Sequence, residues 1–482
     1  MSTFKRFFRD TIIYGIAAVL PKAINVVLVR LHTSKLSPSE YSVNTSFYVW
    51  AAYFNIVLTY GMETTFFRFF NSEKEKGKVI STAFLSILTT SIAALSLLLF
   101  FKETISNALG FSNSIYFSLL IWISILDTLV VIPFAYLRVS GFSKKYTLFR
   151  LLNITIYTIF NLYFLWFLPK KSTTKLDFLT INYNSNFKEG YIFIANLIAS
   201  SITFICVLPL ILKFKISFDK KILQNMLRYS WPILIAGLAY TTNENLDKLI
   251  LEDWLGKETM GSYAGAYKLG VVMSLFIMAF RLGAEPFFFN QAHKKNAPET
   301  YAIILKWFVI VGALFVLFIV SYVDFIASVF LGNKAFYNAI SIVPIILIAN
   351  LLLGIYNNLS IWYKLTDKTR YGMYISIFGA LITIAMLYTL IPIIGFIGAA
   401  WATVGAYLSM VIVSYILGQK HYPVPYDAKR ICIYLITTTF LSAISFLCFK
   451  GVFFINTLLI IMFGVLIYLL EKKELKIIMK TK

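Results

Sequence analysis

The chain contains about fourteen apolar segments of roughly 20 residues, each long enough as an α-helix to cross the ~30 Å core of a bilayer. Few other folds suit such segments, because only helices and closed barrels satisfy their backbone polar groups in lipid. Hydrophobic residues make up 59% of the chain and charged residues only 14%. We therefore predict an all-α polytopic membrane protein that moves something across the membrane.

The segments can be placed from their apolar runs. Pro133 lies inside the fourth segment and predicts a kink, because proline removes a helical hydrogen bond. The stretch Ile391-Pro-Ile-Ile394 predicts a tight hairpin between the eleventh and twelfth segments. The expected segments cover residues 11–31, 41–62, 79–101, 114–137, 147–168, 190–212, 229–250, 260–280, 301–322, 337–360, 371–391, 394–417, 431–449 and 452–470.

Lysine and arginine set the expected orientation, since short cytoplasmic loops carry an excess of both. Of the 44 basic residues, 30 fall on one side, which holds Lys5, Arg6, Arg9 and the C-terminal tail. We expect both termini in the cytoplasm, and an even number of spans agrees with this. The first apolar run is of full span length and no cleavage site follows it, so we expect no cleaved signal peptide.

The net charge of +22 is spread over short loops, where anionic lipid headgroups attract basic residues. We expect membrane lipids as partners, and no nucleic acid. Cys206, Cys432 and Cys448 lie in apolar segments without metal-ligand spacing, so we predict free thiols, no metal site and no cofactor.

A short repeat divides the chain. Segment two ends in Gly61-Met-Glu63-Thr-Thr-Phe-Phe67, and segment eight ends in Gly283-Ala-Glu285-Pro-Phe-Phe288. Both halves start from the same side, which predicts a parallel repeat about an axis along the membrane normal. The expected domains are a six-helix bundle over 1–213, a cytoplasmic linker over 214–228, a second six-helix bundle over 229–417, and two appended helices with a basic tail over 418–482.

Ionisable residues inside apolar segments cost about 2.5–3.5 kcal/mol each to insert, so each marks a candidate site. In the first segment, Lys22, Asn25 and Arg30 form a polar stripe. This stripe fits the wall of an anion-binding cavity. It also fits side chains that extend to the two membrane surfaces; Arg30 slightly favours this second interpretation, and Lys22 fits both equally.

Lys268 follows Gly261 and Gly265, whose spacing lets two helices pack closely. We therefore expect Lys268 to face the protein interior and favour a substrate-binding role for it.

Segment seven ends with two polar pairs, each four residues apart and thus on one helix face. Glu244 and Lys248 fit a helix end that emerges into water. Asn243 and Asp247 fit that interpretation too, or they line the outer mouth of a cavity.

Asp127 lies at mid-membrane depth in the fourth segment. It is protonated, paired with a basic residue or an ion-coupling site. We favour pairing slightly, although Arg138 is about three helical turns away, and we hold Asp247 as a second candidate for coupling or pairing.

Glu63 and Glu285 lie near the expected cytoplasmic surface, with Arg68 and Arg281 close in sequence. These four residues fit a gate made of salt bridges between the halves, and they fit ordinary solvated residues equally well.

Enzymatic signatures are missing. His32, His293 and His421 are scattered, and the chain has no phosphate-binding loop of the kind that binds ATP. We predict that the protein is not an enzyme.

Four stretches carry a family resemblance: residues 60–70, 127–138, 261–268 and 391–400. They resemble bacterial Wzx-type polysaccharide flippases of the multidrug/oligosaccharidyl-lipid/polysaccharide (MOP) exporter superfamily, and the resemblance covers nearly the whole chain. It implies a MATE-like fold of two six-helix bundles plus two C-terminal helices, in the bacterial cytoplasmic (inner) membrane. It also implies a monomer that rocks between inward-open and outward-open states.

The cargo that this resemblance implies is an undecaprenyl-pyrophosphate-linked oligosaccharide such as an O-antigen unit for lipopolysaccharide, with H⁺ or Na⁺ as a candidate coupling ion. Cations in a low-dielectric cavity suit a pyrophosphate. Those cations would be Lys22, Arg30, Lys248 and Lys268, with Asn25 and Asn243 beside them.

Three alternatives stay open. A lipid II flippase would use a similar cavity and fourteen helices. An ion-coupled multidrug antiporter would prefer an acidic cavity and usually twelve. A membrane-embedded glycan polymerase or ligase needs a sizeable outer loop, and the loop 169–188 is a short candidate.

Overall fold

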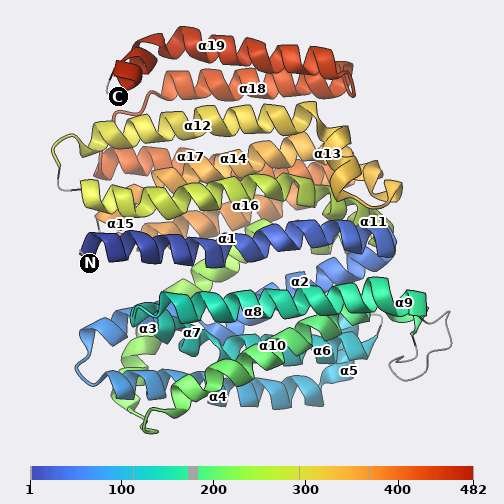
Figure 1. Cartoon of the computed structure of the whole chain (residues 1–482), viewed down its shortest axis with the longest axis vertical. Helices are drawn as coiled ribbons and strands as arrows, with labels where there is room; N and C mark the ends of the chain where they lie inside the picture. The colour runs from blue at the N-terminus through green and yellow to red at the C-terminus, as the bar shows by residue number, and fades with distance from the viewer. Residues whose placement is uncertain (1–2, 112, 172–182, 293, 367, 481–482) are drawn as a thin grey trace. The chain divides into compact units, whose positions relative to one another are not determined.

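A computed structural model describes residues 3–111, 113–171, 183–292, 294–366 and 368–480, and its regular elements there are all helical (Figure 1). The chain forms two compact units, Met1–Ala264 and Gly265–Lys482. Their division falls inside the long helix α11 (Lys220–Gln291). Most of the loop 169–188, the candidate for an enzymatic loop, lies outside the described residues.

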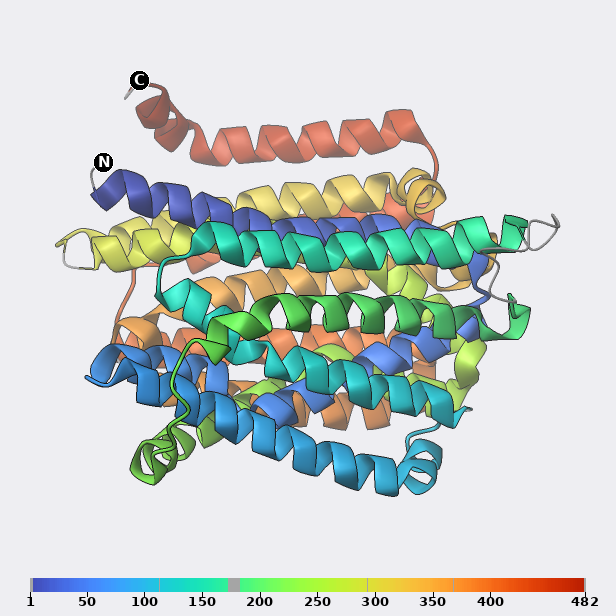
Figure 2. The same ribbon diagram turned by 60° about the horizontal axis from the view of Figure 1, so that its bottom comes forward.

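The first unit holds ten α-helices and the start of α11. Figure 2 shows α8 beside α1, and α10 packs against both α8 and α6. The elements are α1 (Thr3–Lys35), α2 (Pro38–Thr59), α3 (Met62–Ser72), α4 (Lys76–Phe100), α5 (Lys102–Ala108), α6 (Ser114–Leu129), α7 (Val131–Val139), α8 (Ser143–Leu162), the π-helix η1 (Tyr163–Phe167), α9 (Leu168–Lys171), the 3₁₀ turn η2 (Ser185–Phe187) and α10 (Lys188–Leu212).

In the second unit, α16 and α17 form a hairpin, and α14 packs against α17 and α12. The last two helices lie on one side of this bundle, and both α18 and α19 pack against α12 (Figure 1). The elements are α12 (Ala297–Ser321), α13 (Val323–Phe330), the 3₁₀ helix η3 (Lys334–Ile342), α14 (Val343–Leu359), α15 (Ile361–Leu365), α16 (Arg370–Ile394), α17 (Phe396–His421), α18 (Ala428–Cys448) and α19 (Phe453–Lys480).

All fourteen predicted segments fall on helices. Among the described residues, 11 helices are long and apolar enough to cross a membrane. One of them, α11, contains both the seventh and eighth segments and is interrupted at Gly256 (φ 83°, ψ 166°). α1 and α2 are not among the 11. The predicted class, an all-α polytopic membrane protein, is confirmed.

The second predicted segment, 41–62, is too long. Its helix ends at Thr59, and Tyr60 (φ 36°) and Gly61 (φ 74°) adopt left-handed backbone conformations before α3 begins. A Cβ on Gly61 would lie 2.9 Å from the Ser230 carbonyl oxygen and from Ile233 Cβ. Both the backbone angle and the lack of space therefore require glycine at this position.

Prolines and glycines break the helices at other predicted places. The fourth segment breaks at Val130, and Pro133 lies in the first turn of α7, where its missing N–H costs least. The predicted hairpin turns at Gly395 (φ 60°), one residue past the stretch named for it.

The glycine pair on α11 makes the close contacts that its spacing predicts. A Cβ on Gly261 would overlap the carbonyl oxygen of Pro38, at the start of α2. A Cβ on Gly265 would lie 2.5 Å from Cδ1 of Phe336 in the second unit. Each glycine therefore brings α11 close to a neighbouring element of its own unit.

A buried charge cluster holds the two last helices to α12. Lys306 Nζ lies 2.8 Å from Glu471 Oε2 and 2.5 Å from Glu474 Oε1. Arg430 Nη1 lies 3.0 Å from Glu471 Oε1, and the Tyr434 hydroxyl donates to the same oxygen. Apolar packing gains little over lipid contact, so these polar contacts fix where α18 and α19 dock.

Gly261→Ala is expected to lower the thermal unfolding temperature, because the Pro38 backbone cannot move aside; overpacking of this kind costs about 1–3 kcal/mol. Gly283→Ala, in the same helix, is the matched control, since nothing lies within 4 Å of its added Cβ. That control should be neutral or slightly stabilising. Equal unfolding temperatures for the two purified variants would contradict the close packing.

Candidate functional site

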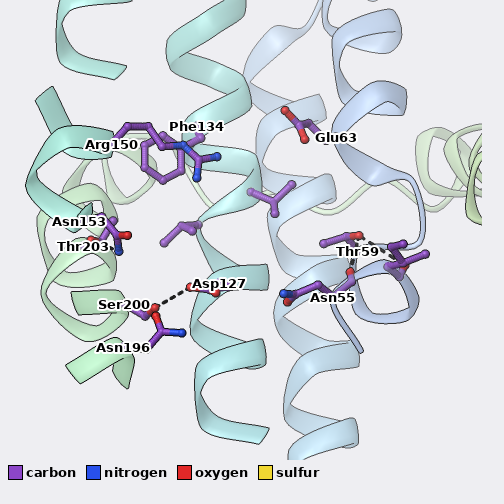
Figure 3. A pocket seen from close by; sticks show the side chains of 13 residues that line it. Asn55, Thr59, Glu63, Asp127, Phe134, Arg150, Asn153, Asn196, Ser200 and Thr203 are labelled. Carbon is purple, nitrogen blue, oxygen red and sulfur yellow. Dashed lines mark hydrogen bonds between the residues drawn. The ribbon is translucent and has the colours of Figure 1, made fainter. Parts of the chain in front are cut away.

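A cavity of about 330 Å³ lies inside the first unit, among α2, α3, α6, α7, α8 and α10 (Figure 3). Figure 3 shows Arg150 and Glu63 toward one end and Asp127, Asn55 and Asn196 toward the other. Polar side chains supply much of the wall, namely Asn55, Thr59, Glu63, Asp127, Arg150, Asn153, Asn196, Ser200 and Thr203.

Helical spacing explains why these residues meet. On α10, Asn196, Ser200 and Thr203 are four and three residues apart and so share one face. Asn55 and Thr59 on α2 are likewise four apart. From the sequence we identified Asp127 and Glu63 but missed the other polar residues of the wall. The spacing of their amides and hydroxyls inside apolar helices could have indicated them.

Asp127 is bound by a hydroxyl. Ser200 Oγ donates to Asp127 Oδ1 at 2.7 Å. Within the described residues no basic side chain forms an ion pair with Asp127, so the pairing that we slightly favoured is not found there. Its second oxygen, Oδ2, accepts no hydrogen bond in the described part of the chain.

Two further groups of the wall carry unused hydrogen-bonding capacity. The guanidinium carbon of Arg150 lies 4.5 Å from the ring centre of Phe134 and 5.7 Å from that of Tyr146, and Arg150 makes no hydrogen bond to any described residue. Asn55 Oδ1 is buried without a hydrogen-bond partner among those residues. Asn153, by contrast, donates to Thr203 Oγ1 at 3.0 Å.

Glu63, at the mouth of the cavity, has a partner that we did not predict. Arg138 Nη1 lies 2.8 Å from Glu63 Oε1. Arg68, which is close to Glu63 in sequence, lies over the ring of Tyr229 at 4.3 Å. Arg138 is far from Glu63 along the chain, at the end of α7, so local spacing does not indicate this pair.

The second unit repeats this arrangement. Glu285 Oε1 contacts Lys364 Nζ on α15 and lies 3.5 Å from Arg281 Nη2. Each acid therefore pairs with a base of its own unit. Arg138 follows the break at Val130 in the fourth segment, and Lys364 follows the break at Ser360 at the end of the tenth segment. This agrees with a repeat, whereas a salt-bridge gate between the halves stays a prediction.

The space beside Glu285 is much smaller, about 10 Å³. Asn357 lines it three residues before the break at Ser360, just as Asp127 lies three residues before the break at Val130. Among the described residues, the first unit thus combines a carboxylate at this position with a cavity of about 330 Å³, whereas the second unit has an asparagine there.

The residues predicted to bind substrate fall into separate groups. Lys22, Asn25 and Arg30 are exposed on α1. Asn243 and Lys248 are buried in the first unit, and Lys268 is half-buried in the second. No single unit brings all of these side chains together.

The predicted solvated end of segment seven is wrong. Lys248 is 6% and Asp247 3% exposed, and Lys248 Nζ lies 2.9 Å from Asp247 Oδ1. The Tyr263 hydroxyl donates to Asp247 Oδ2 at 2.7 Å, and Lys248 Nζ also donates to the Glu244 carbonyl oxygen. Lys248 therefore neutralises a buried carboxylate, and its ammonium group is already engaged.

Lys248→Met should destabilise the protein by about 3–5 kcal/mol, because Asp247 would lose its buried partner. Adding Asp247→Asn should restore most of this loss, since the asparagine can still accept from Tyr263. Thermal unfolding of the wild type, the single variant and the double variant checks this. A double variant no more stable than Lys248→Met would contradict the ion-pair interpretation.

The three cysteines are free thiols, as predicted, and they are exposed. Among the described residues, no group of histidine, cysteine and acidic side chains could hold a metal ion.

Several solved structures share the fold. The lipid II flippase MurJ in an inward closed conformation superposes with a TM-score of 0.75 at 16% identity, over 96% of this chain and 100% of MurJ. An inward-facing multidrug resistance MATE transporter of the MOP superfamily gives 0.68 at 13% identity, over 88% and 98%. A MOP superfamily transporter from Pyrococcus furiosus, described as having a binding pocket of reverse polarity, gives 0.62 at 14% identity, over 89% and 96%.

Family models match the sequence as well. The MatE model matches residues 232–389, and the model described as "Polysaccharide biosynthesis protein" matches residues 7–289, more than half of the chain. No curated protein matches the chain. The resemblance to MOP superfamily flippases is thus confirmed, and the chain is a multi-pass membrane protein that belongs to the polysaccharide biosynthesis protein family.

Proposed function

We propose that the protein is a flippase that moves an undecaprenyl-pyrophosphate-linked oligosaccharide from the inner to the outer leaflet of the bacterial cytoplasmic membrane. The family match over residues 7–289 carries this proposal. The transporter fold supports alternating access between two halves, here 1–213 and 229–417, with both termini in the cytoplasm. Surface polysaccharide, including lipopolysaccharide O-antigen, is the proposed product.

We assign a structural role to cations that are buried in ion pairs and a substrate-binding role to cations that are exposed. Lys248 is ion-paired and buried, so we assign it and its neighbour Asn243 to the structure of α11. The exposed stripe of Lys22, Asn25 and Arg30 is proposed to bind the pyrophosphate, and Lys268 is proposed as a further substrate-binding residue. Exposed cations can exchange water for phosphate oxygens, whereas a buried ion pair would first have to break.

Coupling to H⁺ or Na⁺ is part of this proposal. Of the two carboxylates considered for it, Asp247 is engaged by Lys248 and Tyr263, which leaves Asp127. The pairs Glu63–Arg138 and Glu285–Lys364 are proposed to act at the cytoplasmic gate, each within its own half.

Lipid II flipping is the second candidate function. The similarity to MurJ over 96% of this chain favours it, but that similarity is one of fold, and both cargoes present a polyprenyl pyrophosphate. The accumulated cargo distinguishes the two candidates.

Deletion of the gene should cause a completed polyprenyl-linked repeat unit to build up on the cytoplasmic side, with loss of surface glycan. Mass spectrometry of the lipid-linked pool identifies the cargo, and a complemented strain is the control. Accumulated lipid II would favour the second candidate. Repeat units that reach the outer leaflet but stay unpolymerised would instead indicate an outer-face enzyme, and the flippase proposal would fail.

A further inference from the structure

We propose that the cavity of the first unit is a carbohydrate-binding subsite that takes one sugar ring of the cargo, an inference that rests on the proposed flippase function. The cavity measures about 330 Å³, near the lower end of the roughly 300–1,000 Å³ typical of small-molecule sites. It has room for about ten water molecules at ~30 Å³ each. This space suits one sugar ring with its hydroxyls and excludes a whole oligosaccharide.

The charges of the wall favour a neutral polar ligand. The wall holds an acid, Asp127, and a base, Arg150, while Glu63 is already paired with Arg138. A pyrophosphate would meet the two acidic side chains of the wall, Asp127 and Glu63. A sugar avoids this conflict because its hydroxyls donate and accept without net charge.

The unused hydrogen-bonding groups match sugar hydroxyls. Asn55 Oδ1 is a buried acceptor with no described partner, and leaving such an atom unsatisfied costs about 1–3 kcal/mol. Asp127 Oδ2 is a second open acceptor, while Arg150 offers donors that no described residue accepts. Acceptors and donors thus face one space, as neighbouring hydroxyls of one ring require.

The repeat supplies an internal comparison. In the second unit the corresponding position holds Asn357, and the space there is about 10 Å³, too small for a sugar ring. The subsite therefore belongs to the first half of the transporter. It would bind one sugar residue of the glycan while the cations of α1 bind the pyrophosphate.

The test uses purified full-length protein in lipid nanodiscs. The probe is the free oligosaccharide that mild acid releases from the lipid-linked pool of the deletion strain, and it lacks the pyrophosphate. Calorimetry should show binding to wild type, about tenfold weaker binding to Asn55→Ala and to Arg150→Gln, and unchanged binding to the matched control Asn357→Ala. Unfolding temperatures identify variants that fail to fold. One folded cavity variant is enough for the test.

Equal binding by the cavity variants and wild type would overturn the subsite. No binding to wild type would overturn it too. Complementation of glycan export by wild type is scored separately. If wild type restores export but the cavity variants bind the oligosaccharide as tightly as wild type, the subsite is wrong and the flippase function is still supported.

Discussion

Apolar side chains gain little free energy when they exchange contact with lipid for contact with protein. Close backbone approach and buried polar pairs must therefore hold these helices together. Gly261 brings α11 onto the backbone of Pro38. Glu471 draws Lys306, Arg430 and Tyr434 together where the last two helices dock. These contacts fix where α11 meets α2 and where α18 and α19 meet α12.

The same constraint separates structural charges from functional ones. A charge that stabilises the fold is buried and neutralised, as Lys248 is by Asp247. Lys22 on α1 is exposed instead, and Arg150 covers the ring of Phe134 without forming an ion pair within the described chain. Substrate binding requires groups of this second kind, because an occupied ion pair must break before it can bind anything else.

Much of the fold could be predicted from sequence, because lipid imposes helix length and proline and glycine mark the interruptions. Pro133 predicted the break in the fourth segment, which occurs at Val130. Long-range pairing could not be predicted in the same way. Nothing in local spacing joins Glu63 to Arg138, and the burial of Lys248 depends on how its helix end packs. The cavity could not be predicted because a single amide in an apolar helix does not indicate a site. The amides meet only when α2, α8 and α10 pack together.

The most direct test of the flippase account is transport by the purified protein in proteoliposomes that contain the lipid-linked glycan of the deletion strain. A membrane-impermeant enzyme that cleaves only outer-leaflet glycan reports translocation. The account predicts that wild type makes inner-leaflet glycan accessible and that the Lys22→Ala, Lys268→Ala double variant does so far more slowly at equal incorporation. Equal accessibility with wild type, with the double variant and with empty liposomes would contradict it.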